Sequence, residues 1–334
     1  MLDTETDRSH PPLSPLLGVD SGSPRTHDNL AVFPLLAPDL AGFPYVLLTD
    51  ALAEETLHIT EVGSGSVPDL MASNAGDADV LILDGEQLIG AKQNRITNRT
   101  ILLGARTETQ IPVSCMEQGR WHFESDRFRS RPKPRHAPSG VRRKAREVET
   151  HFAAAPDRAG IDVMRAAQRD VWTEVAALGS SLGVHSATGA MDEFYDRHAE
   201  SLEDWIARFP CAEGQVGLLA LLGGRPLGVD VVGSPELYAR LHERILGGYC
   251  MDALSWRGRG GVRRDTGGPG ADANDGPDLS AVADRFLAEV GSAARGVAPT
   301  AGKGTYRLLS GAAIGAELAE GERLVHLSAF PGAE

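Results

Sequence analysis

From Leu30 to Phe123 the apolar residues come in short runs that are broken by proline, glycine and aspartate. The runs are VFPLL, YVLLTDAL, LHITEV, ADVLILDGEQLIG, TNRTILLGA and TETQIPVSCM. Short apolar or alternating runs between turn-forming residues are typical of β-strands, and Asp84-Gly85 is a strong signal for a two-residue hairpin. The segment therefore predicts an antiparallel β-sandwich or barrel-like domain.

The second half of the chain mixes helical and strand patterns. The stretch GQVGLLALLGGRPLGVDVVG predicts a buried hairpin that turns at Gly223-Gly224, and Ser234-Pro235-Glu236 has the composition of a helix start. No βαβ repeat supports a Rossmann fold, so the prediction is an α+β protein whose C-terminal part is mixed. The predicted elements are helices over about 162–178, 190–208, 235–246 and 280–290, a hairpin over about 214–233 and three strands between about 305 and 330.

Composition divides the chain into segments. The predicted division is a disordered tail (1–28), a β-rich domain (29–124), a basic linker (125–150), a helical connector plus α+β part (151–256 and 279–331) and a flexible insertion (257–278). Nine lysines and arginines lie between Arg127 and Arg146. We interpret this linker as a solvated arm, and the alternative is an arm that holds nucleic acid or another polyanion.

The overall composition excludes several classes of protein. The chain carries 33 Lys+Arg against 46 Asp+Glu, a net charge of −13, which argues against general nucleic-acid binding through bulk charge. No apolar run approaches the roughly 20 residues of a membrane span. The three cysteines form no CxxC pair, which predicts a reduced, cytoplasmic protein.

Common cofactor motifs are also missing. GVAPTAGKGT resembles a P-loop, but its spacing is wrong and Gly304 replaces the Ser/Thr that should follow Lys303. No HxH or HExxH motif occurs, and no GxSxG stretch has the preceding strand that a nucleophile elbow needs, so the sequence predicts neither a nucleophile elbow nor a metal site. The residues point to no particular cofactor.

The segment Ile82–Phe123 is unusually polar for scaffold. If TETQIPVSCME is a strand, Cys115 shares the core face with Ile111 and Val113, and the same phase turns Glu117 inward. Cys115 is most simply a small buried hydrophobe, with a catalytic role as the weaker alternative. Because a buried carboxylate is costly unless it is paired, Glu117 is either part of an ion-pair network or a general acid/base in a pocket.

The stretch Gly90–Arg95 places a cation, two amides and a guanidinium together. Lys92 and Arg95 suit a phosphate or carboxylate ligand, while Gln93 and Asn94 could read its polar groups. The alternative is an ordinary solvated hairpin tip. The candidate ligand-binding residues are Glu86, Lys92, Gln93, Asn94, Arg95, Gln118 and Arg120, and the candidate catalytic residues are Glu117 and Cys115.

Several of these stretches resemble one domain family. They are LILDGEQLIGAKQNRITN, IPVSCMEQGRW, GVHSATGAMDEFYD, EGQVGLLALLGGRPLGVDVVGSPELYARL and RLVHLSAF. The chain is similar over about 30–256 and 280–330 to the ARPP domain family, named for association with ADP-ribosylglycohydrolase and the rhodanese-phosphatase superfamily. The resemblance implies a link to NAD or ADP-ribose metabolism.

Three functional hypotheses follow. In the first, the protein binds or processes a phosphorylated nucleotide-like small molecule, with Arg120 orienting Glu117. In the second, it is a non-catalytic protein-interaction or regulatory module whose polar cluster is a structural network. In the third, the arm over 127–146 binds nucleic acid, which the acidic net charge disfavours. Convergence of Lys92, Arg95 and Glu117 in a pocket would favour the first.

Overall fold

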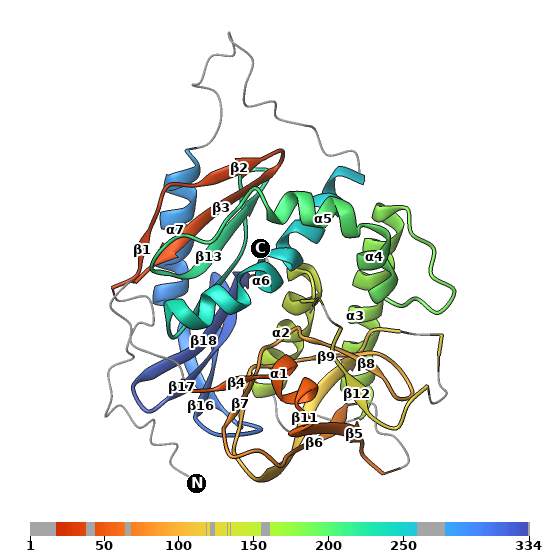
Figure 1. Ribbon diagram of the computed structural model, residues 1–334. Coiled ribbons are helices and arrows are strands. Elements are labelled where there is room, and N and C mark those ends of the chain that lie inside the picture. Colours follow the sequence, from red (N-terminus) through yellow and green to blue (C-terminus); the bar gives the residue numbers. More distant parts are fainter. Residues whose placement is uncertain are drawn as a thin grey trace.

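The computed structural model describes residues 18–37, 44–63, 68–117, 119–120, 124–131, 133, 135–154, 161–258 and 278–332. Within them, antiparallel sheets combine with helices, which confirms the predicted α+β class and the β-rich N-terminal part (Figure 1). Most of the predicted disordered tail and flexible insertion lies outside the described residues, and so do Gln118 and Trp121–Phe123.

The largest sheet has nine strands in the order β1-β3-β13-β14-β18-β17-β16-β15, with β2 also pairing with β3. Its strands are β1 (Asp20–Ser21), β2 (Arg25–His27), β3 (Leu30–Leu36), β13 (Gln215–Leu222), β14 (Arg225–Val232), β15 (Ala294–Ala298), β16 (Thr305–Ser310), β17 (Ala313–Glu320) and β18 (Arg323–Pro331). β13 and β14 form the predicted hairpin. Its turn uses Gly223 at φ 58° and Gly224 at φ 81°, conformations that favour glycine.

The remaining strands form two smaller sheets. One has the order β12-β8-β9-β11-β6-β5 and the other the order β10-β7-β4. Their bounds are β4 (Val46–Leu47), β5 (Leu57–Glu61), β6 (Asp69–Asn74), β7 (Val80–Ile82), β8 (Gln87–Gly90), β9 (Arg95–Thr97), β10 (Ile101–Leu103), β11 (Thr107–Cys115) and β12 (Phe128–Arg129). β12 also contacts β5, so the six-stranded sheet nearly closes into a barrel. β11 buries Ile111, Val113 and Cys115, which confirms its predicted core face.

The predicted hairpin at Asp84-Gly85 is wrong. β7, before the turn, pairs with β10 and β4, whereas β8, after it, pairs with β9 and β12. Gly85 does adopt a turn conformation, at φ 80°, and its N–H donates to the Thr97 carbonyl at 2.7 Å. A Cβ on Gly85 would lie 2.9 Å from Arg142 Cδ, so the turn is packed against a distant side chain rather than closing a hairpin.

Seven helices complete the described part of the chain: α1 (Leu48–Ala53), α2 (Ser139–Ala154), α3 (Ile161–Leu182), α4 (Asp192–Arg197), α5 (Ala199–Ile206), α6 (Pro235–Gly258) and α7 (Leu279–Ser292). α6 begins as predicted, and Ser234 Oγ accepts the Leu237 N–H at 3.2 Å. It continues beyond the predicted end at Leu246 because Tyr249, Cys250 and Met251 extend its buried face. None of these helices is both long and apolar enough to cross a bilayer.

The nine-stranded sheet is buried on both faces. Phe33 and Leu35 of β3 pack with Phe286 of α7 on one face, where Figure 1 shows α7 running along the sheet. Leu218 of β13 packs in the cluster that contains Leu241 of α6 on the other face. β3 comes from the N-terminal segment, yet it pairs with β13 far along the chain. The sheet is therefore completed by a strand from the opposite end of the sequence.

Candidate functional site

The predicted site residues do not converge on one pocket. They form three polar groups, centred on Glu117, Arg95 and Glu86, and the first two meet at the turn between β8 and β9. Two surface hollows lie elsewhere. One, of about 400 Å³, is lined by Tyr45, Val46, Asp50, Ala53, Glu54 and Arg240; the other, of about 200 Å³, is lined by Trp172, Val175, Ala176, Gly179, Ser180, Val184, His185, Ser186, Gly189 and Phe194.

Glu117 lies in a fully bonded group with Arg120. Arg120 Nε donates to Glu117 Oε2 at 2.8 Å, and Thr188 Oγ1 donates to Glu117 Oε1 at 2.8 Å. Arg120 also donates to Asn94 Oδ1 at 3.0 Å and to the Ala91 carbonyl at 2.9 Å. Burial alone would raise the pKa of the Glu117 carboxyl, but these hydrogen bonds outweigh burial and lower it. The group favours a structural carboxylate that is ionised at neutral pH over a general acid/base.

Arg95, the first residue of β9, points into the protein. Arg95 is 0% exposed, and its NH1 donates to Gln93 Oε1 at 3.0 Å while NH2 lies 3.6 Å from Glu61 Oε1. Gly90 N–H donates to Asn94 Oδ1 at 3.1 Å, which stabilises the tight turn. Arg95 and Gln93 are therefore not presented to a surface ligand, and within the Lys92–Arg95 stretch only Lys92 and Asn94 keep part of their surface.

Glu86 is buried rather than placed at a hairpin tip. It is 3% exposed and forms an ion pair with Arg244 of α6. Its Oε2 also accepts the Leu83 N–H at 3.0 Å. Glu86 therefore ties the β-rich part to α6, a partner that sequence proximity could not suggest.

Cys115 matches its simpler interpretation. It is 1% exposed, and burial raises the pKa of its thiol to about 11, although Arg95 opposes this shift. A thiol in this state carries little thiolate at neutral pH, and the thiolate is the nucleophile. The backbone of Cys115 instead exchanges two hydrogen bonds with the Gln168 amide of α3.

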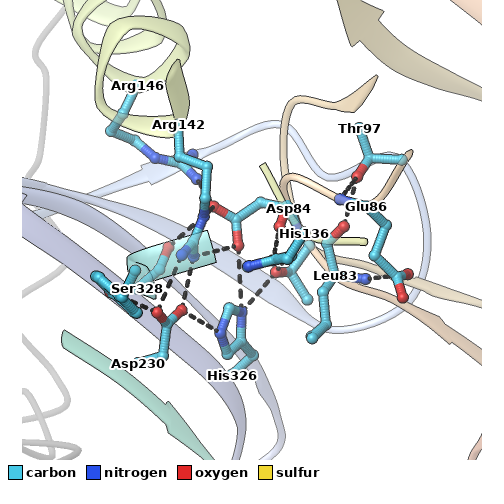
Figure 2. Close-up of polar contacts among 12 residues, drawn as sticks. Leu83, Asp84, Glu86, Thr97, His136, Arg142, Arg146, Asp230, His326 and Ser328 are labelled. Carbon is cyan, nitrogen blue, oxygen red and sulfur yellow. Dashed lines mark hydrogen bonds and ion pairs between the residues drawn. The ribbon is translucent and has the colours of Figure 1, made fainter. Parts of the chain in front are cut away.

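A larger polar network, which the sequence did not predict, lies between α2, the nine-stranded sheet and the turn after β7 (Figure 2). None of its members is more than 4% exposed, and we call it the central network. It comprises Asp84, Thr100, Arg142, Arg146, Asp230, Tyr249, His326 and Ser328.

Arg142 lies at the middle of the central network, between two carboxylates. Its NH1 and NH2 donate to Asp230 at 3.0 and 2.6 Å, and its Nε and NH2 donate to Asp84 at 3.2 and 3.1 Å. Burial would raise the pKa of both carboxyls, but Arg142 holds both pKa values far below their usual range. Tyr249 and Ser328 donate to the remaining lone pairs. The charges are therefore compensated within the protein.

His326 links Thr100 to Asp230. Its Nδ1 lies 2.7 Å from Thr100 Oγ1, and its Nε2 lies 3.1 Å from Asp230 Oδ1. An aspartate, a histidine and a hydroxyl in this order have the connectivity of a nucleophilic triad. However, Thr100 Oγ1 also accepts the Asp84 N–H at 3.2 Å, and none of these residues lines either hollow described above. The arrangement orients side chains but presents no nucleophile to a substrate.

The same residues have the spacing of a metal site. Asp84, Asp230 and His326 offer ligand atoms that all lie within 4.8 Å of one another. Two carboxylates and an imidazole suit a divalent transition metal. Arg142 already bridges the two carboxylates, so a metal ion could bind only if this guanidinium moved. The geometry therefore favours arginine as the resident cation.

The prediction of a solvated basic arm is wrong for its C-terminal part. Arg142 and Arg146 are 3% and 1% exposed because α2 packs against the sheet. Upstream, Arg135 forms ion pairs with Asp192 and Asp196. These arginines are bound within the protein, which removes much of the charge that a polyanion would need.

Sequence signals for the central network exist, but they are weak. Asp230 interrupts the apolar run GVDVVG, and His326 and Ser328 alternate with apolar residues in LVHLSAF. Arg142 and Arg146 are four residues apart, and this spacing puts them on one helix face. Each signal has an ordinary explanation alone, because nothing local shows that positions 84, 142, 230 and 326 meet.

The carboxyl of Asp252 accepts a hydrogen bond at the N-terminus of α2, and its ionisation should change the stability of the protein with pH. Asp252 of α6 accepts the Ser139 N–H at 2.7 Å, and burial raises the pKa of this carboxyl to about 6, although the Ser139 hydrogen bonds oppose the shift. In the unfolded chain the pKa of this carboxyl is about 4. The protonated Asp252 carboxyl therefore contributes fully to the free energy of unfolding below that pH, and the contribution is lost as the pH rises through about 6.

We therefore expect Asp252→Asn to remove part of the pH dependence of stability. Because the side chain keeps some exposed surface, the free energy of unfolding of the wild type relative to the variant should fall by about 1–2 kcal/mol between pH 5 and pH 8. Urea denaturation of both proteins across this range measures the difference. A difference that does not change with pH would contradict the expected shift.

The fold and the central network define a mixed α+β protein stabilised by buried, compensated charges. A family model described as the ARG and Rhodanese-Phosphatase-superfamily-associated Protein domain, ARPP-1, matches residues 18–330. The chain therefore belongs to the ARPP-1 family, as the quoted stretches predicted. No curated protein and no solved structure shows significant similarity to it.

Proposed function

We propose that this ARPP-1 protein is a non-catalytic interaction or regulatory module. One observation carries the proposal: Glu86, Arg95, Glu117 and Arg120, which were expected to act on a ligand, are buried and bonded within the protein. Lys92 is half-buried. Glu117 with Arg120, Arg95 with Glu61 and Glu86 with Arg244 each form an internal pair. Such pairs specify packing between elements, while a phosphate site needs cations that can reach the ligand.

Binding of a phosphorylated nucleotide-like compound, linked to NAD or ADP-ribose metabolism, is the second candidate function. It is favoured by Lys92, which keeps part of its surface next to Asn94, another half-buried residue of the same turn.

The three cysteines are free, and two of them are buried, which supports the cytoplasmic location that the sequence predicts.

A thermal-shift panel separates the two functions. NAD, ADP-ribose, ribose phosphates, nucleotides, sugars and divalent metals are added to the wild type, Lys92→Ala and Glu117→Gln. The proposed module predicts no shift with these compounds and a loss of about 2–3 kcal/mol of stability in Glu117→Gln, since the substitution disrupts a buried, hydrogen-bonded charge.

Two exposed residues provide matched controls. Glu108→Gln is the control for Glu117→Gln, because Glu108 is an exposed residue of β11. Lys133→Ala is the control for Lys92→Ala, because the side chain of Lys133 is 82% exposed. Both should change stability by less than about 0.5 kcal/mol. A compound that raises the melting temperature of the wild type and of Lys133→Ala, but not of Lys92→Ala, would replace the proposal with the ligand-binding function.

A further inference from the structure

β15 ends the nine-stranded sheet with an open edge. It pairs with β16 on one side, and among the described elements it has no partner strand on the other. A Cβ built on Gly296 meets no atom within 4 Å. An edge strand leaves a row of backbone N–H and C=O groups that pair readily with another strand.

The usual protections of an edge strand are weak here. β15 contains no proline and no lysine, and its single charge, Arg295, turns back into its own subunit. Arg295 Nε lies 3.1 Å from Glu317 Oε2, and its NH1 donates to the Ala293 carbonyl at 2.9 Å. Val297 is 75% exposed, and among the described residues it is the one large hydrophobic side chain that is exposed.

At the opposite end of the sheet, the outer strands offer few free backbone groups for pairing. β1 and β2 have two and three residues, and both pair with β3. They carry the charged residues Asp20 and Arg25 at exposed positions. Charged and very short edges discourage further pairing, so the two ends of the sheet differ in their capacity to add a strand.

We infer that two copies of this chain associate by antiparallel pairing of β15 with β15, which joins their nine-stranded sheets across a two-fold axis. An identical edge is self-complementary in this arrangement. Repulsion between the two Arg295 side chains is reduced, because each is paired with Glu317 of its own copy, a carboxylate that it shares with Arg307. Ala294, Gly296 and Ala298 are small and leave room for the second strand, and Val297 packs beside it. This inference is independent of the function proposed above.

The association should be weak and should strengthen with salt. A ladder of five residues buries far less surface than a standard interface, so we expect a dimer that forms at high protein concentration. Each copy carries a net charge of −13, and this long-range repulsion is screened as ionic strength rises.

Sedimentation velocity of the full chain tests the inference, with concentrations raised to the millimolar range at low and high salt. The wild type should shift from 35.5 kDa toward twice this mass, and more so at high salt. Val297→Lys should weaken the association at least about tenfold, because it adds a charge to the paired edge. Ser201→Lys, an exposed position on α5 that adds the same charge, should behave like the wild type.

Hydrogen exchange identifies the paired strand. The amides of 294–298 should exchange more slowly at high than at low concentration in the wild type, and equally in Val297→Lys. A wild type that remains monomeric at every concentration overturns the inference. A dimer that Val297→Lys leaves intact, without protection of β15, also overturns it.

Discussion

Replacing Arg142 by methionine should lower the free energy of unfolding by about 3–5 kcal/mol. Breaking a buried ion pair by removing one partner leaves an uncompensated charge, and here both Asp84 and Asp230 lose their bidentate donor. Urea denaturation followed by circular dichroism measures the loss. Arg143→Met is the matched control on the same helix, because Arg143 is 33% exposed and pairs with Glu147 near the surface, so we expect a change of less than about 0.5 kcal/mol.

A metal titration of the wild type and of an Arg142→Gly variant tests whether arginine or a metal ion is the cation of the central network. If Arg142 is the resident cation, Mn²⁺ or Zn²⁺ should raise the melting temperature of an Arg142→Gly variant, in which the two carboxylates and His326 are freed, and leave the wild type unchanged. Metal stabilisation of the wild type would instead show that the guanidinium gives way to an ion. Equal losses of stability in Arg142→Met and Arg143→Met would contradict the central role of Arg142.

The second large effect is expected from Gly217→Ala, at about 2–3 kcal/mol of lost stability. A Cβ at position 217 would overlap the Asp230 carbonyl oxygen and lie 2.9 Å from Val231 Cα, so β13 and β14 would have to separate. Overpacking against backbone costs this much because neither strand can move without disturbing its other neighbour. The variant should also disturb the central network through Asp230.

Gly296→Ala is the matched control for Gly217→Ala. It too adds one methyl group to a strand of the same sheet, but nothing lies within 4 Å of the added atom. We expect its stability to match the wild type or to exceed it slightly, since alanine restricts the unfolded chain. Thermal unfolding of the two variants provides the comparison, and similar destabilisation of both would show that close backbone approach is not the cause.

Local patterns predicted many of the strands and helices of this protein, but α2 (Ser139–Ala154) begins where the sequence predicted a linker. The inward phase of β11, the glycine turn between β13 and β14 and the start of α6 at Ser234-Pro235 depend on residues next to one another in the chain. Which elements pair with one another was harder to predict from the sequence. Asp84-Gly85 has a hairpin composition, but the strands on either side of it enter different sheets, and the turn packs on Arg142.

The same limit applies to the polar residues. The inward position of Glu117 followed from strand phase, and Arg120 was expected to orient it. Thr188 and Arg244 were not named, since only tertiary packing brings them to Glu117 and Glu86. The central network was missed for this reason, because its charges come from four distant segments and each looks ordinary alone.

The place of β3 in the sheet has a consequence for how this chain reaches its native state. β3 is made early during synthesis, but its partner β13 begins only at Gln215. Until then, the apolar stretch LAVFPLL lacks its ladder with β13, and neither α6 nor α7 covers it. Pairing over such a sequence separation slows folding, and unpaired strands are prone to aggregate. A chaperone that covers this stretch during synthesis should therefore improve the yield of the folded protein.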